Sequence, residues 1–116
     1  MHELPVMQSV LVVVLRHASL HRVGRVHSIR LRVGLLSDLE PEWMQRYFDH
    51  LSAGTVAEGA KLVVEWAPAV FVCLKCSNRF ELDHKRFDEV ACPSCGERDF
   101  RLVSGREYHI VDMEAQ

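Results

Sequence analysis

Apolar residues recur three or four positions apart near the beginning of the chain, as they do on one face of a helix. These residues are Leu4, Met7, Leu11, Leu15 and Ala18. Pro5 fits a first helical turn, where no backbone N–H is needed. The pattern predicts a helix over residues 4–18. A buried strand over 10–15 remains the alternative, because this run is rich in β-branched valine.

A different pattern follows, in which apolar and polar residues alternate. Residues 27–33 show this alternation and predict a strand whose wet face carries Arg30 and Arg32. Three further segments are strand-like, with Pro68 closing the first and Gly105 providing a turn between the other two. They are residues 61–66, 100–103 and 107–113.

A second helix is predicted from residue 41 onward. Ser37 and Glu40 have the spacing of a capping box, and Pro41 fits the first turn. Gly54 can end the helix. One helical face is apolar. Its members are Met44, Tyr47, Phe48 and Leu51.

Composition limits the classes of protein that remain. A chain of 116 residues suits one compact domain, or a small core with a metal-stapled lobe. The net charge of -2 disfavours a general nucleic-acid binder, which is usually basic. The run Leu11–Leu15 is too short to span a bilayer, and the first residues lack the positive charge of a signal peptide. We therefore expect a cytoplasmic protein with no membrane segment.

The strongest chemical signal is a pair of Cys-x-x-Cys motifs. They are formed by Cys73 with Cys76 and by Cys92 with Cys95, and residues 77–91 separate them. This spacing is typical of a zinc ribbon, in which each pair grips one side of a tetrahedron. Four thiolates leave no open position, so the zinc is predicted to be structural. Iron in the same site, and free or disulfide-bonded cysteines, are the alternatives.

Glycine and aromatic residues around the cysteines support a small metal-stapled lobe. Gly96 permits a tight turn after the second pair, and Asn78 is expected to do the same after the first. The phenylalanines are interpreted as the lobe's core, not as a platform for stacking bases. They are Phe71, Phe80, Phe87 and Phe100.

The chain begins Met1-His2-Glu3. A free α-amine, the His2 amide and imidazole nitrogens, and the Glu3 nitrogen and carboxylate can form fused chelate rings around one metal. Nitrogen and oxygen donors of this kind suit Ni(II) or Cu(II) in a tetragonal geometry. By itself the motif is weak, since any chain can begin this way.

Taken together, these features resemble the HypA/HybF family of hydrogenase nickel-insertion proteins. The resemblance includes the Met-His-Glu start with Leu4 and Gln8, segment 54–62 before a strand, the two cysteine pairs, and segment 104–110 as a closing strand. It spans essentially the whole chain, in order.

The resemblance implies an α+β fold with two helices packed on a small β-sheet and an inserted zinc-ribbon-like four-cysteine lobe. The nickel-binding domain would contain residues 1–69 and 104–116, and the zinc-binding domain residues 70–103. The family implies a metallochaperone and not an enzyme. It also implies a GTPase of the HypB type and a hydrogenase large subunit as partners, with urease as a second possible recipient.

The resemblance assigns the metal ligands residue by residue. Nickel would be bound by His2 together with the α-amine of Met1 and with Glu3. Zinc would be bound by the four cysteines, Cys73, Cys76, Cys92 and Cys95.

Other residues have alternative interpretations. His84 is a candidate extra nickel ligand. His17 and His21 could share a helical face and form a metal pair. Arg22 and Gly24 suggest that the helix has ended nearby, which favours solvated surface residues. His50 and His109 are expected on element surfaces. The early chain is rich in arginine, either as a solvated face or as a dock for an acidic partner.

No phosphate loop, nucleophile motif or open zinc site is visible in the sequence. Two alternatives to the nickel metallochaperone therefore remain, and neither is an enzyme. One is a zinc-ribbon module that binds nucleic acid or protein, and the other is an electron-transfer protein with iron in the four-thiolate site.

Overall fold

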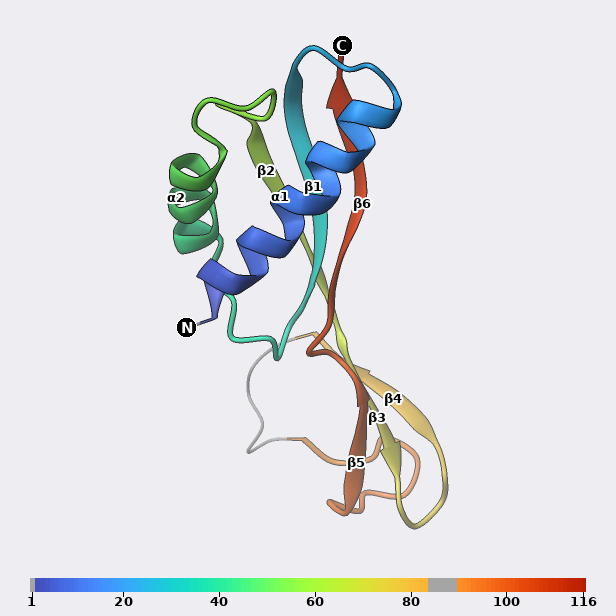
Figure 1. The fold of residues 1–116 in the computed structure, drawn as a ribbon. Helices are drawn as coiled ribbons and strands as arrows, with labels where there is room; N and C mark the ends of the chain where they lie inside the picture. The colour runs from blue at the N-terminus through green and yellow to red at the C-terminus, as the bar shows by residue number, and fades with distance from the viewer. Residues whose placement is uncertain (1, 84–89) are drawn as a thin grey trace. The chain divides into compact units, whose positions relative to one another are not determined.

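The computed structural model describes residues 2–83 and 90–116. The chain divides into two compact units (Figure 1). The first, here called the helical unit, contains Met1–Arg32, Asp38–Glu65 and His109–Gln116. The second, here called the cysteine unit, contains Val33–Ser37 and Trp66–Tyr108.

Two helices and one three-stranded sheet dominate the helical unit. The sheet order is β2-β1-β6, and both helices lie on one face of it (Figure 1). This arrangement confirms the predicted α+β fold. The elements are α1 (Glu3–Leu20), β1 (Val26–Gly34), α2 (Pro41–Ser52), β2 (Lys61–Ala67) and β6 (Tyr108–Ala115).

The helix predicted near the N-terminus is confirmed, but its buried face is shifted. Val10 and Val14 are buried, whereas Leu11 and Leu15 are half-buried and Leu4 is exposed. Met7 and Ala18 are buried as expected. Because α1 is apolar on several faces, periodicity alone did not define which face would pack.

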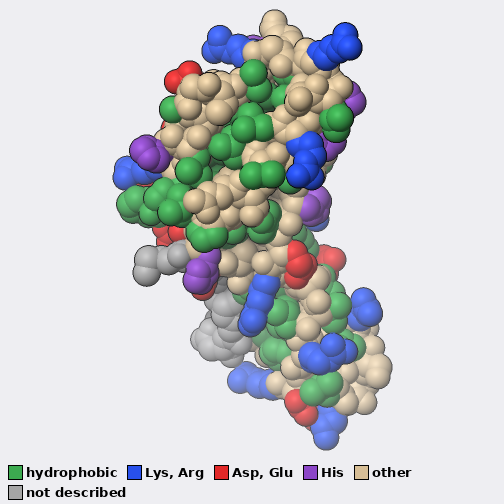
Figure 2. All heavy atoms as spheres, viewed as in Figure 1, with side chains coloured by type: hydrophobic (Ala, Val, Ile, Leu, Met, Phe, Trp, Pro, Cys, Tyr) green, Lys and Arg blue, Asp and Glu red, His purple; other side chains and the backbone are tan. Residues whose placement is uncertain are grey.

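Hydrophobic side chains also reach the surface over α1 (Figure 2). Val12, Val13 and Leu20 are exposed. Among the described residues, α1 is the one helix long and apolar enough to cross a membrane, with a mean hydropathy of 1.2 over 18 residues. One side of α1 is buried in the core, which explains many of its apolar residues.

The start of α2 differs from the predicted capping box. The N-cap is Glu40, and no side chain caps the helix. Asp38 instead adopts a left-handed backbone with φ of 61°, and Leu39 is buried. Glu40 is extended, as a residue before proline usually is. Pro41 therefore begins the helix without the expected Ser37 cap, and the helix ends before Gly54 as predicted.

Arg30 of β1 ties the three strands of the helical unit together. It forms ion pairs with Asp112 of β6 and, at 3.3 Å, with Glu65 of β2. The hydrogen bond to Asp112 raises the pKa of Arg30 further. The side chain is partly exposed, which agrees with the predicted wet face of this strand.

A second three-stranded sheet organises the cysteine unit. It contains β3 (Ala69–Cys73), β4 (Arg79–Leu82) and β5 (Phe100–Ser104) in the order β4-β3-β5. Both neighbours run antiparallel to β3, and Phe71 lies opposite Phe80 on one side and Leu102 on the other. The sequence predicted β5 but not β3 or β4.

Aromatic packing fills the small core of this unit, as the sequence suggested. The ring of Phe71 lies 5.6 Å from that of Phe80 and 5.0 Å from that of Phe100. Buried Ala69, Leu82 and Val90 complete the cluster. The fourth predicted core aromatic, Phe87, lies outside the described residues.

The backbone at Gly34 passes very close to the turn at Gly105 in the cysteine unit. A Cβ atom on Gly34 would lie 2.2 Å from the Gly105 carbonyl oxygen. The neighbouring Leu36 N–H donates a 2.7 Å hydrogen bond to the same oxygen. Gly105 itself has a φ of 139°, which confirms the predicted turn. Only glycine fits at position 34 without moving the backbone.

Gly34→Ala is therefore expected to lower the free energy of unfolding by more than about 3 kcal/mol, because backbone atoms cannot yield as a flexible side chain does. Denaturant unfolding measures the effect. Gly24→Ala is the matched control, since its Cβ would meet nothing closer than 3.8 Å. Equal stability of the two variants would contradict the close approach.

The turn between β5 and β6 is held by the Glu107 carboxylate. It accepts hydrogen bonds from the backbone N–H of Gly105 at 3.0 Å and of Arg106 at 3.2 Å. These bonds lower the pKa of Glu107 below its ordinary value. A carboxyl group with a lowered folded pKa stabilises the fold above its unfolded pKa, and this contribution is lost as pH falls through the folded pKa.

Glu107→Gln is thus expected to be less stable than the parent chain at pH 7, because the charge that strengthens these bonds is removed. The difference should shrink in strong acid, where the parent carboxyl is also neutral. Parallel unfolding curves at the two pH values measure it. A stability difference that stayed constant with pH would show that the carboxylate charge is unimportant.

Candidate metal centre

Two short turns of the cysteine unit present the four cysteines. The first turn follows β3 and contains Cys73 and Cys76, and the second contains Cys92 and Cys95. The first cysteine of each pair is buried and the second is exposed.

The two turns repeat one hydrogen-bond pattern. The N–H of Ser77 donates to the carbonyl of Cys73 at 3.0 Å, and that of Gly96 donates to Cys92 at 2.8 Å. The N–H of Cys73 donates to Asn78 at 2.9 Å, and that of Cys92 to Glu97 at 2.8 Å. The two Cys-x-x-Cys motifs therefore form equivalent turns.

A positive φ closes each turn. Gly96 has a φ of 75°, which confirms its predicted role. In the first turn the corresponding residue is Ser77, with a φ of 63°, and not Asn78. The prediction for Asn78 is wrong because the required position directly follows the second cysteine in both turns.

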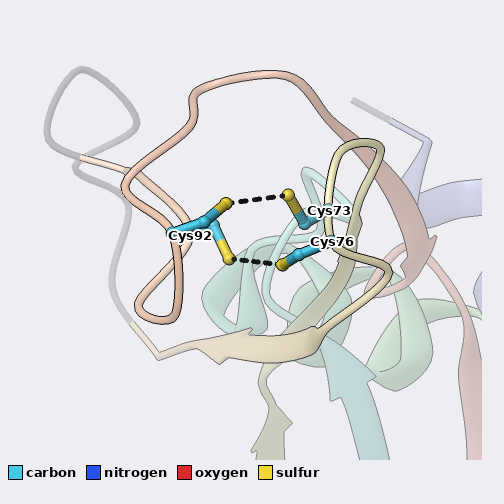
Figure 3. A group of neighbouring side chains, drawn as sticks. Cys73, Cys76 and Cys92 are labelled. Carbon is cyan, nitrogen blue, oxygen red and sulfur yellow. Dashed lines mark hydrogen bonds between the residues drawn. The ribbon is translucent and has the colours of Figure 1, made fainter.

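The four sulfur atoms form one compact group (Figure 3). Cys73 Sγ lies 3.6 Å from Cys95 Sγ, and Cys76 Sγ lies 3.5 Å from Cys92 Sγ. All four lie within 4.8 Å of one another. These separations are much longer than a disulfide bond of about 2.05 Å. They are close to the roughly 3.8 Å edge of a tetrahedron with Zn–S bonds of about 2.3 Å.

Backbone N–H groups favour ionisation of the first cysteine in each turn. For Cys73, the Cys76 N–H contributes most to a lowered pKa. For Cys92, burial acts in the opposite direction, but the N–H groups of Cys95 and Ser94 lower the pKa to about 6. These two thiols are therefore prepared to become metal-binding thiolates.

The second cysteine of each turn has a raised pKa and keeps its proton more tightly than the first. The Glu97 N–H favours the Cys95 thiolate, but burial and the neighbouring cysteines outweigh it and raise the pKa of Cys95 to about 12. The pKa of Cys76 is raised as well, despite the Asn78 N–H, with Cys92 as the leading opposing group. A bound divalent cation deprotonates thiols, so it would hold all four cysteines as thiolates, and the group fits a zinc ion chemically as well as geometrically.

The predicted nickel ligands lie in a different part of the chain. His2 is exposed and is the N-cap of α1, without a side-chain capping bond. Glu3 begins α1 and is only 5 % exposed. Met1 and His84 lie outside the described residues, so their predicted roles remain predictions. Among residues 2–83 and 90–116, the four cysteines are the one group of three or more side chains arranged to hold a metal.

The backbone N–H groups that favour the thiolates have no signal in the sequence. The histidines outside the predicted nickel site have several different environments. His50 and His109 are exposed, as expected. His27 forms a 2.9 Å hydrogen bond with Gln116. His17 and His21 have stacked rings, which the sequence did not establish.

The sequence of the whole chain decides the family. A family model described as hydrogenase/urease nickel incorporation, metallochaperone, hypA, matches residues 1–115. The chain belongs to the HypA family. Hydrogenase maturation factors HypA from Acidithiobacillus ferrooxidans and Methylocella silvestris are 33 % and 35 % identical to it over 116 residues. Both matches cover all of each chain.

Solved structures show the same fold for HypA. The solution structure of the nickel metallochaperone HypA from Helicobacter pylori has a TM-score of 0.68 at 20 % identity, covering 99 % of this chain and 97 % of that one. Another solution structure, of a HypA protein, has a TM-score of 0.72 at 19 % identity and covers 100 % and 97 %. The predicted family is therefore confirmed, together with the fold.

Proposed function

We propose that the protein is a nickel metallochaperone that binds Ni(II) at its N-terminus and delivers it for maturation of [NiFe]-hydrogenase. The observation that carries this proposal is the match to the HypA family over residues 1–115, in a chain that begins Met1-His2-Glu3. The same match favours nickel delivery over a zinc-ribbon module that binds nucleic acid, and over an enzyme.

The position of His2 supports the proposed nickel site. An exposed imidazole at the start of α1 can exchange a metal with a partner without any opening of the core. The first N–H groups of a helix have no intrahelical acceptor. The backbone nitrogens of His2 and Glu3 can therefore bind nickel without breaking the helix, together with the α-amine of Met1.

Glu3 contributes to this site mainly through its backbone nitrogen in our proposal. Its side chain is almost fully buried in the wall of a surface cavity that also contains Leu4, Glu40 and Trp43. Movement of the carboxylate to the metal would require rotation out of this wall. The imidazole, amide and amine donors need no such rearrangement.

The cysteine unit has a structural role in this proposal. Zn(II) bound by Cys73, Cys76, Cys92 and Cys95 would hold both turns, and its filled shell would leave no position for a substrate. The helical unit would then provide nickel binding and the cysteine unit zinc binding. The predicted nickel-binding domain, 1–69 with 104–116, and zinc-binding domain, 70–103, have the same two functions with somewhat different bounds.

Delivery requires partners that accept the metal. We propose a GTPase of the HypB type and the hydrogenase large subunit or its maturation complex, acting in the cytoplasm, with urease as a further recipient. Nickel held by a few exposed donors would pass to a partner that offers more ligands or better geometry.

A bacterial strain that lacks its own HypA protein tests this function. The parent chain is expected to restore nickel-dependent hydrogenase activity, whereas His2→Ala should not, at equal protein level and low nickel. Urease activity, measured in the same cells, decides the second recipient. Full restoration of hydrogenase by His2→Ala would contradict delivery from the N-terminus.

A further inference from the structure

The last turn of α1 brings two histidines together on one face of the helical unit. The backbone N–H of His21 donates a 3.0 Å hydrogen bond to the carbonyl of His17, so the helical i to i+4 geometry continues to His21. The two imidazole rings are stacked, with centroids 6.0 Å apart and planes 12° from parallel. The helix ends at Leu20, close to Arg22 and Gly24 as the sequence suggested, and the C-cap His21 still lies one turn after His17.

We propose that His17 and His21 form a second, labile site for a late first-row divalent metal such as Ni(II), independent of the proposed N-terminal site. Imidazoles four residues apart have the spacing that places two histidine ligands on one metal in helical zinc motifs. Both side chains are exposed, so water can complete the coordination. The ring nitrogens are the donors that such metals commonly accept from proteins.

The end of the helix provides a second reason for a cation at this place. His17 lies in the last turn of α1, and His21 is its C-cap. The last carbonyl groups of a helix carry a partial negative charge, which attracts cations. A metal bound by both imidazoles would lie beside this end of the helix.

Neighbouring arginines oppose the metal and make the site weak. Arg16 and Arg22 are adjacent in sequence to the two histidines, and both are exposed. Water and salt screen repulsion between exposed charges, so it reduces the affinity without preventing binding. Two protein ligands and nearby positive charge together predict a site that releases its metal readily.

Nickel titration of the zinc-loaded His2→Ala chain tests the proposal, because the proposed N-terminal site is then absent. One weak nickel site is expected, and adding His21→Ala should weaken it at least about tenfold, since the second imidazole otherwise binds intramolecularly. His50→Ala is the matched control, because His50 is also exposed and lies in the last turn of a helix. It should leave the affinity unchanged.

NMR of the imidazole rings gives a direct reading of the same titration. Paramagnetic Ni(II) should broaden the signals of His17 and His21 before those of the other histidines. Simultaneous broadening of all exposed histidines, or equal affinities in the His21→Ala and His50→Ala chains, would overturn the proposal.

The two proposed nickel sites remain distinguishable. In a chain that retains His2, His21→Ala should leave tight N-terminal nickel binding unchanged. Loss of that tight binding would show that the sites are not independent and would overturn the second site as proposed. Loss of tight binding only with His2→Ala would support both proposals.

Discussion

Cys73→Ser is expected to release zinc and to unfold the cysteine unit more than the helical unit. One of four thiolates is lost, and serine is a poor zinc ligand. Structural zinc contributes about 10–16 kcal/mol of apparent binding energy in small peptides, whereas whole domains are stable by only about 5–15 kcal/mol. The core of the unit, centred on Phe71, Phe80 and Phe100, is too small to replace that contribution.

Zinc analysis and amide hydrogen exchange measure this result. Protection should fall in β3, β4 and β5, while amides of α1 remain protected. Ser94→Ala is the control, because Ser94 lies between Cys92 and Cys95 and favours the Cys92 thiolate through its backbone N–H, which alanine retains. One zinc per chain in Cys73→Ser, with unchanged protection in β3, would contradict a structural four-cysteine site.

The second large effect is expected at the N-terminus. His2→Ala should weaken Ni(II) binding by more than about 100-fold, since changes in outer-shell partners alone cost metal sites 10- to 100-fold. Zinc content and the fold should not change, because His2 is exposed and caps α1 without a side-chain bond. Calorimetric titration of the untagged, zinc-loaded chain measures the affinity.

Extension of the N-terminus provides an independent version of this experiment. A few added residues convert the α-amine of Met1 into an amide and should abolish tight nickel binding while His2 is retained. His109→Ala, at an exposed position of β6, is the control for loss of an unrelated histidine. Tight nickel binding by the extended chain would show that the amine is not a ligand.

Most elements of the fold followed from local sequence patterns. The alternating burial of β1 and the turn at Gly105 are present in the structure, because each depends mainly on residues close together in sequence. The buried face of α1 did not follow, since Val10 and Val14 compete with equally apolar Leu11 and Leu15, and only packing in the folded chain decides between them. Likewise, the predicted capping box at Ser37 does not form, because Pro41 begins α2 and Glu40 is its N-cap.

Within the metal centre, cysteine spacing predicted which residues come together. It did not predict the backbone N–H groups that lower the pKa of Cys73 and Cys92, because every residue has such a group and only the turn geometry directs it at sulfur. For the same reason, the sequence did not predict that Ser77, and not Asn78, adopts the positive φ that closes the first turn. The stacking of His17 and His21 depends on the backbone at the C-cap of α1, which local sequence signals do not define to a single residue.

X-ray absorption at the nickel edge, on untagged zinc-loaded protein with one equivalent of Ni(II), identifies the atoms that bind nickel. We expect only nitrogen and oxygen donors. In the His21→Ala chain, which lacks the second proposed site, the imidazole contribution should disappear when His2→Ala is added. Sulfur ligands to nickel, or an imidazole contribution that stays unchanged when His2→Ala is added to His21→Ala, would contradict nickel binding at the N-terminus.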